Sequence, residues 1–175
     1  MVREERIAVP EGVVASVEGK RVKVSGPKGT VTMTFEIPWL ELTAEGKEIV
    51  VRVPLERRKH KAMLGTVQAH LRNAFKGVKE GWSQRLRIVY AHFPISVKVE
   101  ADKKRVLILN FLGEKAPRVA EIVGDVQVRV EGDEVIVEGA DKYEVGQTAW
   151  NIEKATRIKR RDPRVFQDGI YRVGA

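Results

Sequence analysis

LGTVQAHLRNA, residues 64–74, aligns with VGQTAWNIEKA, residues 145–155, at an offset of 81 residues. Earlier matches fall in the same order: Pro10 with Pro94, Arg21-Val22 with Arg105-Val106, Gly29 with Gly113, and Glu45-Gly46 with Glu131-Gly132. Matches in one order, with small shifts at loops, indicate a tandem duplication. Two copies are too few for a repeat solenoid, so the sequence predicts two similar domains, over residues 1–81 and 82–175.

Each copy shows short valine-rich runs followed by one apolar helical stripe. In the first copy the runs are 13–17, 22–24, 31–35 and 49–53, and the helix is expected over about 61–76. In the second copy they are 86–90, 95–99, 106–110, 126–130 and 135–137, and the helix is expected over about 144–158. Several strands followed by one helix predict an α+β fold, in which each domain is a small, mostly antiparallel sheet packed with one main helix.

The composition restricts the classes of function. The 175 residues carry a net charge of +8, with no cysteine, which excludes disulfides, thiolate chemistry and zinc fingers. The charge is +5 over residues 1–81, −2 over 82–153 and +5 over 154–175. Such localised charge favours an anionic partner. No apolar stretch is long enough for a membrane span and the first residues lack a signal sequence, so we expect a soluble, cytoplasmic protein without membrane contacts.

The last fifth of the chain combines cations with aromatic residues. Seven cations stand against Asp162 and Asp168: Lys154, Arg157, Lys159, Arg160, Arg161, Arg164 and Arg172. The spacing of Lys154, Arg157 and Arg161 predicts one face of a helix. Arginines bind phosphate bidentately and aromatic rings can stack on bases, so Phe166 and Tyr171 among these cations indicate an RNA-binding element. The alternatives are a solvated charge run, or a protein scaffold whose basic tail binds an acidic partner.

Catalytic and metal-binding patterns are missing from the sequence. His60, His70 and His92 lack metal-ligand spacing; His60 is expected in a basic surface patch and His70 on a helix face. The GPKGT segment, residues 26–30, lacks the spacing of a phosphate loop and predicts a hairpin turn. We therefore expect no enzyme, no cofactor and no metal. The signatures of sequence-reading RNA modules are also missing, so we expect structured RNA that is recognised by its shape and backbone, and no DNA partner.

Three segments resemble the large-subunit ribosomal protein L-six family: VPEGVVASVEGKRVKVSGPKGTV (residues 9–31), GADKYEVGQTAWNIEKATRI (139–158) and RVFQDGIY (164–171). The last has the form of archaeal and eukaryotic members, and an archaeal source is expected. The resemblance implies a non-catalytic component of the large ribosomal subunit. It further implies that the second domain binds large-subunit rRNA near the sarcin–ricin loop. Neighbouring ribosomal proteins and transiently docked translational GTPases are then the expected protein partners.

Carrying the family motif over assigns rRNA contact to Gln147, Asn151, Lys154, Arg157, Arg164, Phe166, Asp168, Gly169 and Tyr171. The cation band adds Lys159, Arg160, Arg161 and Arg172. Asp168 and Gly169 are expected to shape the loop, and Phe166 and Tyr171 could equally pack the tail onto the domain. Trp150 stands where the family often has a small residue, so packing or an RNA-facing surface is expected there.

Overall fold

The computed structural model describes residues 2–54 and 57–174. The chain divides into two compact units, Met1–Gly81 and Trp82–Ala175. Helix α1, Arg58–Glu80, precedes the division and is capped by Gly81. Gly81 has a φ of +82°, a conformation that glycine adopts without steric cost. Its N–H donates to the Gly77 carbonyl at 2.9 Å, which satisfies one of the carbonyls at the helix end.

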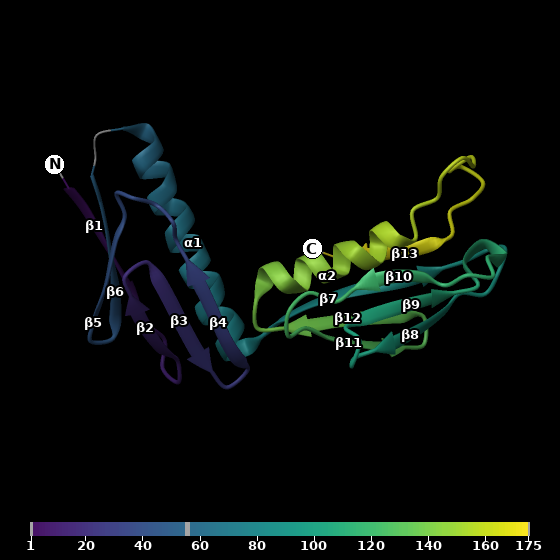
Figure 1. Ribbon diagram of the computed structural model, residues 1–175, viewed down its shortest axis with the longest axis horizontal. Helices are drawn as coiled ribbons and strands as arrows, with labels where there is room; N and C mark the ends of the chain where they lie inside the picture. The colour runs from purple at the N-terminus through teal and green to yellow at the C-terminus, as the bar shows by residue number, and fades with distance from the viewer. Residues whose placement is uncertain (1, 55–56, 175) are drawn as a thin grey trace. The chain divides into compact units, whose positions relative to one another are not determined.

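The first unit contains two antiparallel three-stranded sheets and α1 (Figure 1). One sheet has the order β1-β6-β5, and the other β2-β3-β4. Their bounds are β1 Val2–Ala8, β2 Val14–Glu18, β3 Arg21–Gly26, β4 Gly29–Thr34, β5 Glu41–Glu45 and β6 Glu48–Pro54. Strand β2 approaches β5, and α1 packs mainly on β3, β4 and β6, so the helix spans both sheets.

The core of the first unit joins the valines of β6 to the apolar stripe of α1. Val50, Val51, Val67 and Leu71 are all fully buried. The predicted helix over 61–76 is therefore confirmed and is longer at both ends. The prediction of a surface His60 is wrong: it is 5% exposed and its ring lies 4.3 Å from that of Trp39.

The GPKGT segment forms the predicted hairpin turn. Gly26 pairs with Gly29 at the end of the β3–β4 ladder. The Lys28 N–H donates to the Val78 carbonyl at 2.8 Å, and a Cβ added to Gly26 would lie 2.5 Å from that same carbonyl oxygen. Glycine is needed here because the turn touches the backbone of α1.

The second unit repeats this plan and extends it (Figure 1). Its sheets have the orders β11-β12-β7-β13 and β10-β9-β8, and every pairing is antiparallel. The bounds are β7 Trp82–Val89, β8 Ser96–Glu100, β9 Arg105–Leu109, a 3-10 turn Phe111–Gly113, β10 Arg118–Glu121, β11 Gln127–Glu131, β12 Glu134–Gly139, α2 Lys142–Ala155 and β13 Gly169–Val173. Strand β8 approaches β11, as β2 approaches β5.

The order β7-β12-β11 reproduces β1-β6-β5, and β8-β9-β10 reproduces β2-β3-β4. The α+β class with tandem units is thus confirmed. Strand β13 is the one added strand among the described residues, and it covers the edge of β7. Helix α2 packs against β7, β10, β12 and β13.

Sequence patterns do not predict four of the strands, β1, β5, β10 and β13. Strand β1 reads VREERIA and β10 reads RVAE, so both are rich in charge. Only Ile7 of β1 is buried, and its neighbours form ion pairs instead of an apolar face. Such strands are held by their partners' backbone, which a hydropathy pattern does not register.

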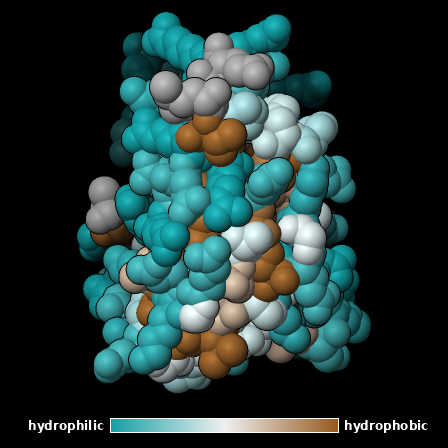
Figure 2. Space-filling model, turned by 90° about the vertical axis from the view of Figure 1, so that its left-hand side faces the viewer, coloured by the Kyte–Doolittle hydropathy of each residue, from teal (hydrophilic) through white to brown (hydrophobic). Residues whose placement is uncertain are grey.

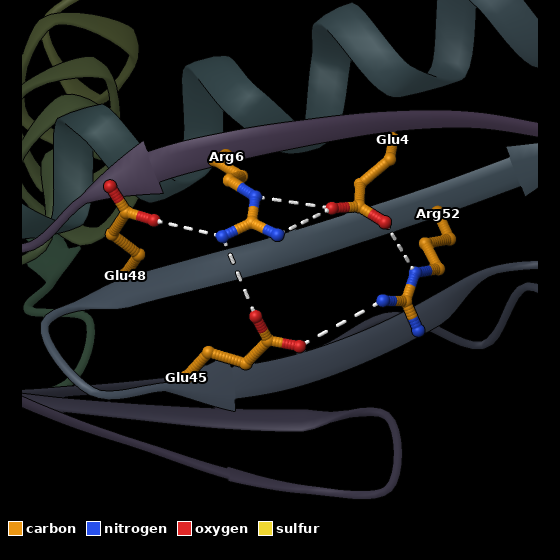
Figure 3. A network of polar contacts seen from close by, with 5 residues as sticks. All are labelled: Glu4, Arg6, Glu45, Glu48 and Arg52. Atoms are coloured by element: carbon orange, nitrogen blue, oxygen red, sulfur yellow. Dashed lines mark hydrogen bonds and ion pairs between the residues drawn. The ribbon is translucent and has the colours of Figure 1, made fainter.

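Five charged residues of the first unit form a network of ion pairs on one face of the β1-β6-β5 sheet (Figure 3). Arg6 lies among three carboxylates, those of Glu4 at 3.0 Å and of Glu45 and Glu48 at 3.6 Å. Arg52 links Glu4 and Glu45 from the neighbouring strand β6. The molecular face in Figure 2 is mostly hydrophilic, with apolar residues in small areas. No helix among the described residues is long and apolar enough to cross a membrane.

Candidate RNA interface

Helix α2 carries only the first cation, Lys154, of the basic segment, residues 154–172. The Asp141 side chain begins the helix by accepting from the Tyr143 N–H at 2.9 Å. The helix ends at Ala155, so Lys154 lies in its last turn while Arg157 and Arg161 lie beyond it. The prediction of Lys154, Arg157 and Arg161 on one helical face is therefore wrong.

Two side chains explain why α2 ends there. Arg118, from β10, donates through Nη1 to the carbonyls of Ala155 and Arg157, both at 3.0 Å. Thr156 is buried; its hydroxyl donates to the Glu153 carbonyl at 3.1 Å and accepts from the Ile170 N–H at 3.0 Å. Because these bonds fix the backbone as it leaves the helix, the following loop starts in a defined direction.

The loop between α2 and β13 is held at its C-terminal end by hydrogen bonds to a buried carboxylate. Asp168 is 1% exposed and accepts from the His92 ring at 3.0 Å and from the backbone N–H groups of His92 and Ala91 at 3.3 and 3.4 Å. Burial alone raises the pKa of the Asp168 carboxyl, but these hydrogen bonds hold it below its usual value. Phe166 stacks on His92 with ring centroids 4.6 Å apart.

Three of the arginines lie over aromatic rings. The guanidinium of Arg157 is 5.5 Å, and that of Arg172 5.7 Å, from the centroid of the Trp150 ring. The guanidinium of Arg161 lies 4.8 Å from the ring of Phe166. Contact with a ring face restricts the position of the guanidinium group without using its N–H donors. The N–H groups can therefore still donate hydrogen bonds to phosphate oxygens.

Two arginines also make ion pairs within the unit. Arg172 contacts Glu153 of α2 at 2.5 Å, and Arg164 contacts Asp162 at 3.0 Å. The Arg164 side chain is 89% exposed, so its pair with Asp162 is a surface contact. Lys154, Lys159 and Arg160 are exposed.

The other predicted contact residues have structural partners. Gln147 donates to Asn151 at 3.0 Å, and Asn151 donates to the Glu121 carbonyl at 3.1 Å, so this pair links α2 to β10. The Tyr171 hydroxyl donates to the Gln167 carbonyl at 2.9 Å. Gly169 is buried, and a Cβ there would lie 3.1 Å from the Tyr171 ring.

Sequence reasoning misses His92, Arg118, Glu153 and Thr156 as supports of this region. His92 and Asp168 are 76 positions apart, and Arg118 and Arg157 are 39 apart. Neither spacing has a local signature, because sheet pairing and helix packing create both contacts. A groove of about 260 Å³ lies between the end of α2 and the loop, and Trp150, Phe166 and Tyr171 are among its lining residues.

The arrangement can bind an extended polyanion. Seven cations and two anions lie within residues 154–175, on a backbone fixed by buried hydrogen bonds at both ends of the loop. Guanidinium groups offer fork-shaped donors to phosphate oxygens, and the exposed ring of Tyr171 offers a flat face. No group of three or more metal-ligating side chains occurs within the described part of the chain.

Comparison with known proteins connects this site to a family. The model described as "Ribosomal protein L6" matches residues 9–81 and 93–169, one range in each unit. "Large ribosomal subunit protein uL6" of the archaeon Methanosarcina mazei is 50% identical over 175 residues, covering 99% of this chain and 98% of that protein. The proteins of that name from Methanothrix thermoacetophila and Aeropyrum pernix are both 49% identical, covering 96% and 95% of this chain and 94% and 91% of their own lengths. With matches in both units and relatives of this identity over nearly its whole length, the chain belongs to the ribosomal protein L6 family.

Proposed function

We propose that this protein is a non-catalytic component of the large ribosomal subunit in the cytoplasm, and that its second unit binds large-subunit rRNA. The observation that carries the proposal is the basic segment, residues 154–172, held in a fixed path by Thr156 and Asp168. A solvated charge run does not need a buried carboxylate at its end. The membership in the L6 family and the names of its archaeal relatives support the same partner.

The proposed contacts fall into two groups. Direct phosphate contacts come from exposed cations: Lys154, Arg157, Lys159, Arg160, Arg161, Arg164 and Arg172. The remaining proposed residues shape the surface or meet riboses and bases: Gln147, Asn151, Phe166, Asp168, Gly169 and Tyr171. Asp168 belongs to the shaping group because its oxygens already accept hydrogen bonds inside the unit.

The affinity for RNA would come from the positive charge of the basic segment and from its fixed backbone. Each cation that meets a phosphate releases counterions, so affinity falls as salt rises. If all seven cations met phosphates, the logarithm of the affinity would fall with log salt at a slope of roughly −6. Arg164 and Arg172 would exchange their carboxylate partners for phosphates, which reduces their net contribution.

The resemblance to the family also implies where the protein sits. We propose that the contacted RNA lies near the sarcin–ricin loop, with neighbouring ribosomal proteins alongside and translational GTPases nearby during translation. The slightly acidic stretch 82–153, with a net charge of −2, agrees with a second unit that binds RNA only at its basic end. DNA is not an expected partner.

The salt dependence of RNA binding tests the site. The double variant Arg157→Ala/Arg164→Ala should bind a large-subunit rRNA transcript more weakly, and its salt slope should be less negative by about 2, one for each lost phosphate contact. Lys103→Ala/Lys115→Ala is the matched control, because it removes two exposed cations outside the basic segment. Unchanged binding by the first variant would refute the site assignment.

Sedimentation of the tagged protein from cell extract tests the assembly. Co-migration with the large subunit, lost on ribonuclease treatment, is the expected result. An assembly that survives ribonuclease would instead favour a protein scaffold with an acidic partner.

A further inference from the structure

A groove of about 390 Å³ lies beside β1 in the first unit. Its β1 wall is formed by Arg6, Ile7 and Ala8. Its α1 wall is formed by Arg72, Phe75, Lys76, Lys79 and Glu80. In the second unit, the space between the corresponding strand and helix is filled by β13.

The duplication fixes the correspondence between the two strand edges. Ile7 pairs with Ile49, and Leu86 pairs with Val135, which is the repeat partner of Ile49 at the offset of 86. Ile7 therefore corresponds to Leu86. Strand β13 pairs with β7 on both sides of Leu86, from Arg85 to Val89.

The backbone of β1 is ready for a further strand at the same place. The Val9 N–H donates to the Lys47 carbonyl at 2.8 Å, on the side of β6. Because hydrogen-bonding groups alternate along an antiparallel strand, those of Arg6 and Ala8 point away from β6. Among the described strands, β1 pairs with β6 alone.

The helix positions that contact β13 differ in chemistry between the units. At the repeat offset of 81, Arg72 corresponds to Glu153 and Phe75 to Thr156. In the second unit Glu153 binds Arg172, and Thr156 accepts from the Ile170 N–H. In the first unit the equivalent positions are a cation and a buried ring, so an occupant needs a carboxylate where β13 has Arg172.

We propose that this groove binds an extended acidic segment of a partner protein, which adds antiparallel to β1. An apolar side chain of the segment occupies the place of Ile170, opposite Val9, diagonal to Ile7 and against Phe75. A carboxylate two residues further along faces Arg72, since residues i and i+2 of a strand share a face. Strand addition suits the site better than RNA, because the edge offers alternating N–H and C=O groups beside an apolar floor.

Two peptides provide the probe. The first carries the sequence of residues 166–174 with Arg172→Glu, and the second keeps the arginine. Each is titrated into the ¹⁵N-labelled full-length protein by NMR. The glutamate peptide should shift the signals of Arg6, Ile7 and Ala8 and bind about fivefold more tightly, because one ion pair replaces one repulsion.

Variants of the protein localise the contact. Arg72→Glu should invert the order of the two peptides, whereas Arg58→Glu, an equal charge change outside the groove on the same exposed helix surface, should not. N-methylation of the peptide at Tyr171 should abolish binding, since that N–H would bond the strand edge.

Four results would overturn the proposal. They are the lack of any shift with either peptide, affinity independent of residue 72, self-association of the protein through β1, and displacement of the same signals by short RNA. The last two would identify a second copy or a nucleic acid as the occupant. None of these results depends on RNA binding by the second unit.

Discussion

The two units share one strand order but treat the same sheet edge differently. In the second unit the chain returns after α2 and closes the edge of β7 with β13. In the first unit the helix continues to Glu80, and the β1 edge has no such strand among the described residues. The duplicated framework is thus independent of β13. What the returning chain adds is a covered edge and a fixed loop for the cations.

The packing of the two helices follows from this difference. Helix α2 contacts β7 and β13 as well as β10 and β12, whereas α1 packs mainly on β3, β4 and β6. Ile170 of β13 and Leu86 of β7 are fully buried, so the added strand forms part of the core. On β1, Ile7 is buried but borders the groove.

The largest expected effect compares Ile170→Ala with Ile7→Ala. Removing the Ile170 side chain leaves a closed cavity, so the second unit should lose about 2–5 kcal/mol of its free energy of unfolding. Ile7→Ala should cost the first unit less, because water and neighbouring side chains can fill the open groove. Urea unfolding followed through the NMR signals of each unit measures both. Equal losses would show that β13 is not a core element.

A smaller effect should come from Asp168, which has no buried counterpart among the ion pairs of β1. The pKa of the Asp168 carboxyl lies below its usual value in the folded state. The ionised carboxylate therefore stabilises the fold fully at pH values above the unfolded-state pKa near 3.8. This stabilisation is lost as the pH falls through the lower folded-state pKa. Asp168→Asn should cost about 1–3 kcal/mol at pH 7. The free energy of unfolding of the Asp168→Asn variant should also change less between pH 5 and pH 2 than that of the unsubstituted protein.

Urea unfolding at several pH values gives this comparison. Asp162→Asn is the control, because Asp162 is an exposed partner of Arg164 in the same loop. The role given to Asp168 would be wrong if both variants followed the same pH dependence.

The smallest effect is expected in the ion-pair network of Figure 3. The pKa of Glu4 is lowered mainly by its hydrogen bond from Arg52, yet both groups are solvated on the open sheet face. Glu4→Gln should therefore change stability by little more than the experimental error, and high salt should remove even that difference. Urea unfolding at low and high salt checks it. A loss comparable to that of Asp168→Asn would mean that the network, unlike other surface pairs, is a main support of the first unit.

Much of the fold can be predicted because apolar patterning survives duplication. The valines of β6 and β12 and the stripes of α1 and α2 recur at nearly constant offsets, which indicates both the α+β class and the two copies. The charged strand β1 gives no such signal, because its position depends on pairing with β6. The end of α2 cannot be read from the local sequence either, because Arg118 of β10 and the Ile170 N–H, which bonds Thr156, fix it from distant parts of the chain.

The candidate site divides in the same way. Its cations and aromatic residues can be read directly, because charge and residue type are properties of the sequence. Their arrangement is not predictable: the spacing predicts a helical face, but Arg157 and Arg161 lie beyond α2. Their guanidinium groups lie over the rings of Trp150 and Phe166. The duplication, the fold class and the basic character of the C-terminal segment follow from residue types and their order along the chain. Which sheet edge is closed and where each cation lies depend on the folded structure, because contacts between residues far apart in the chain fix the backbone at those points.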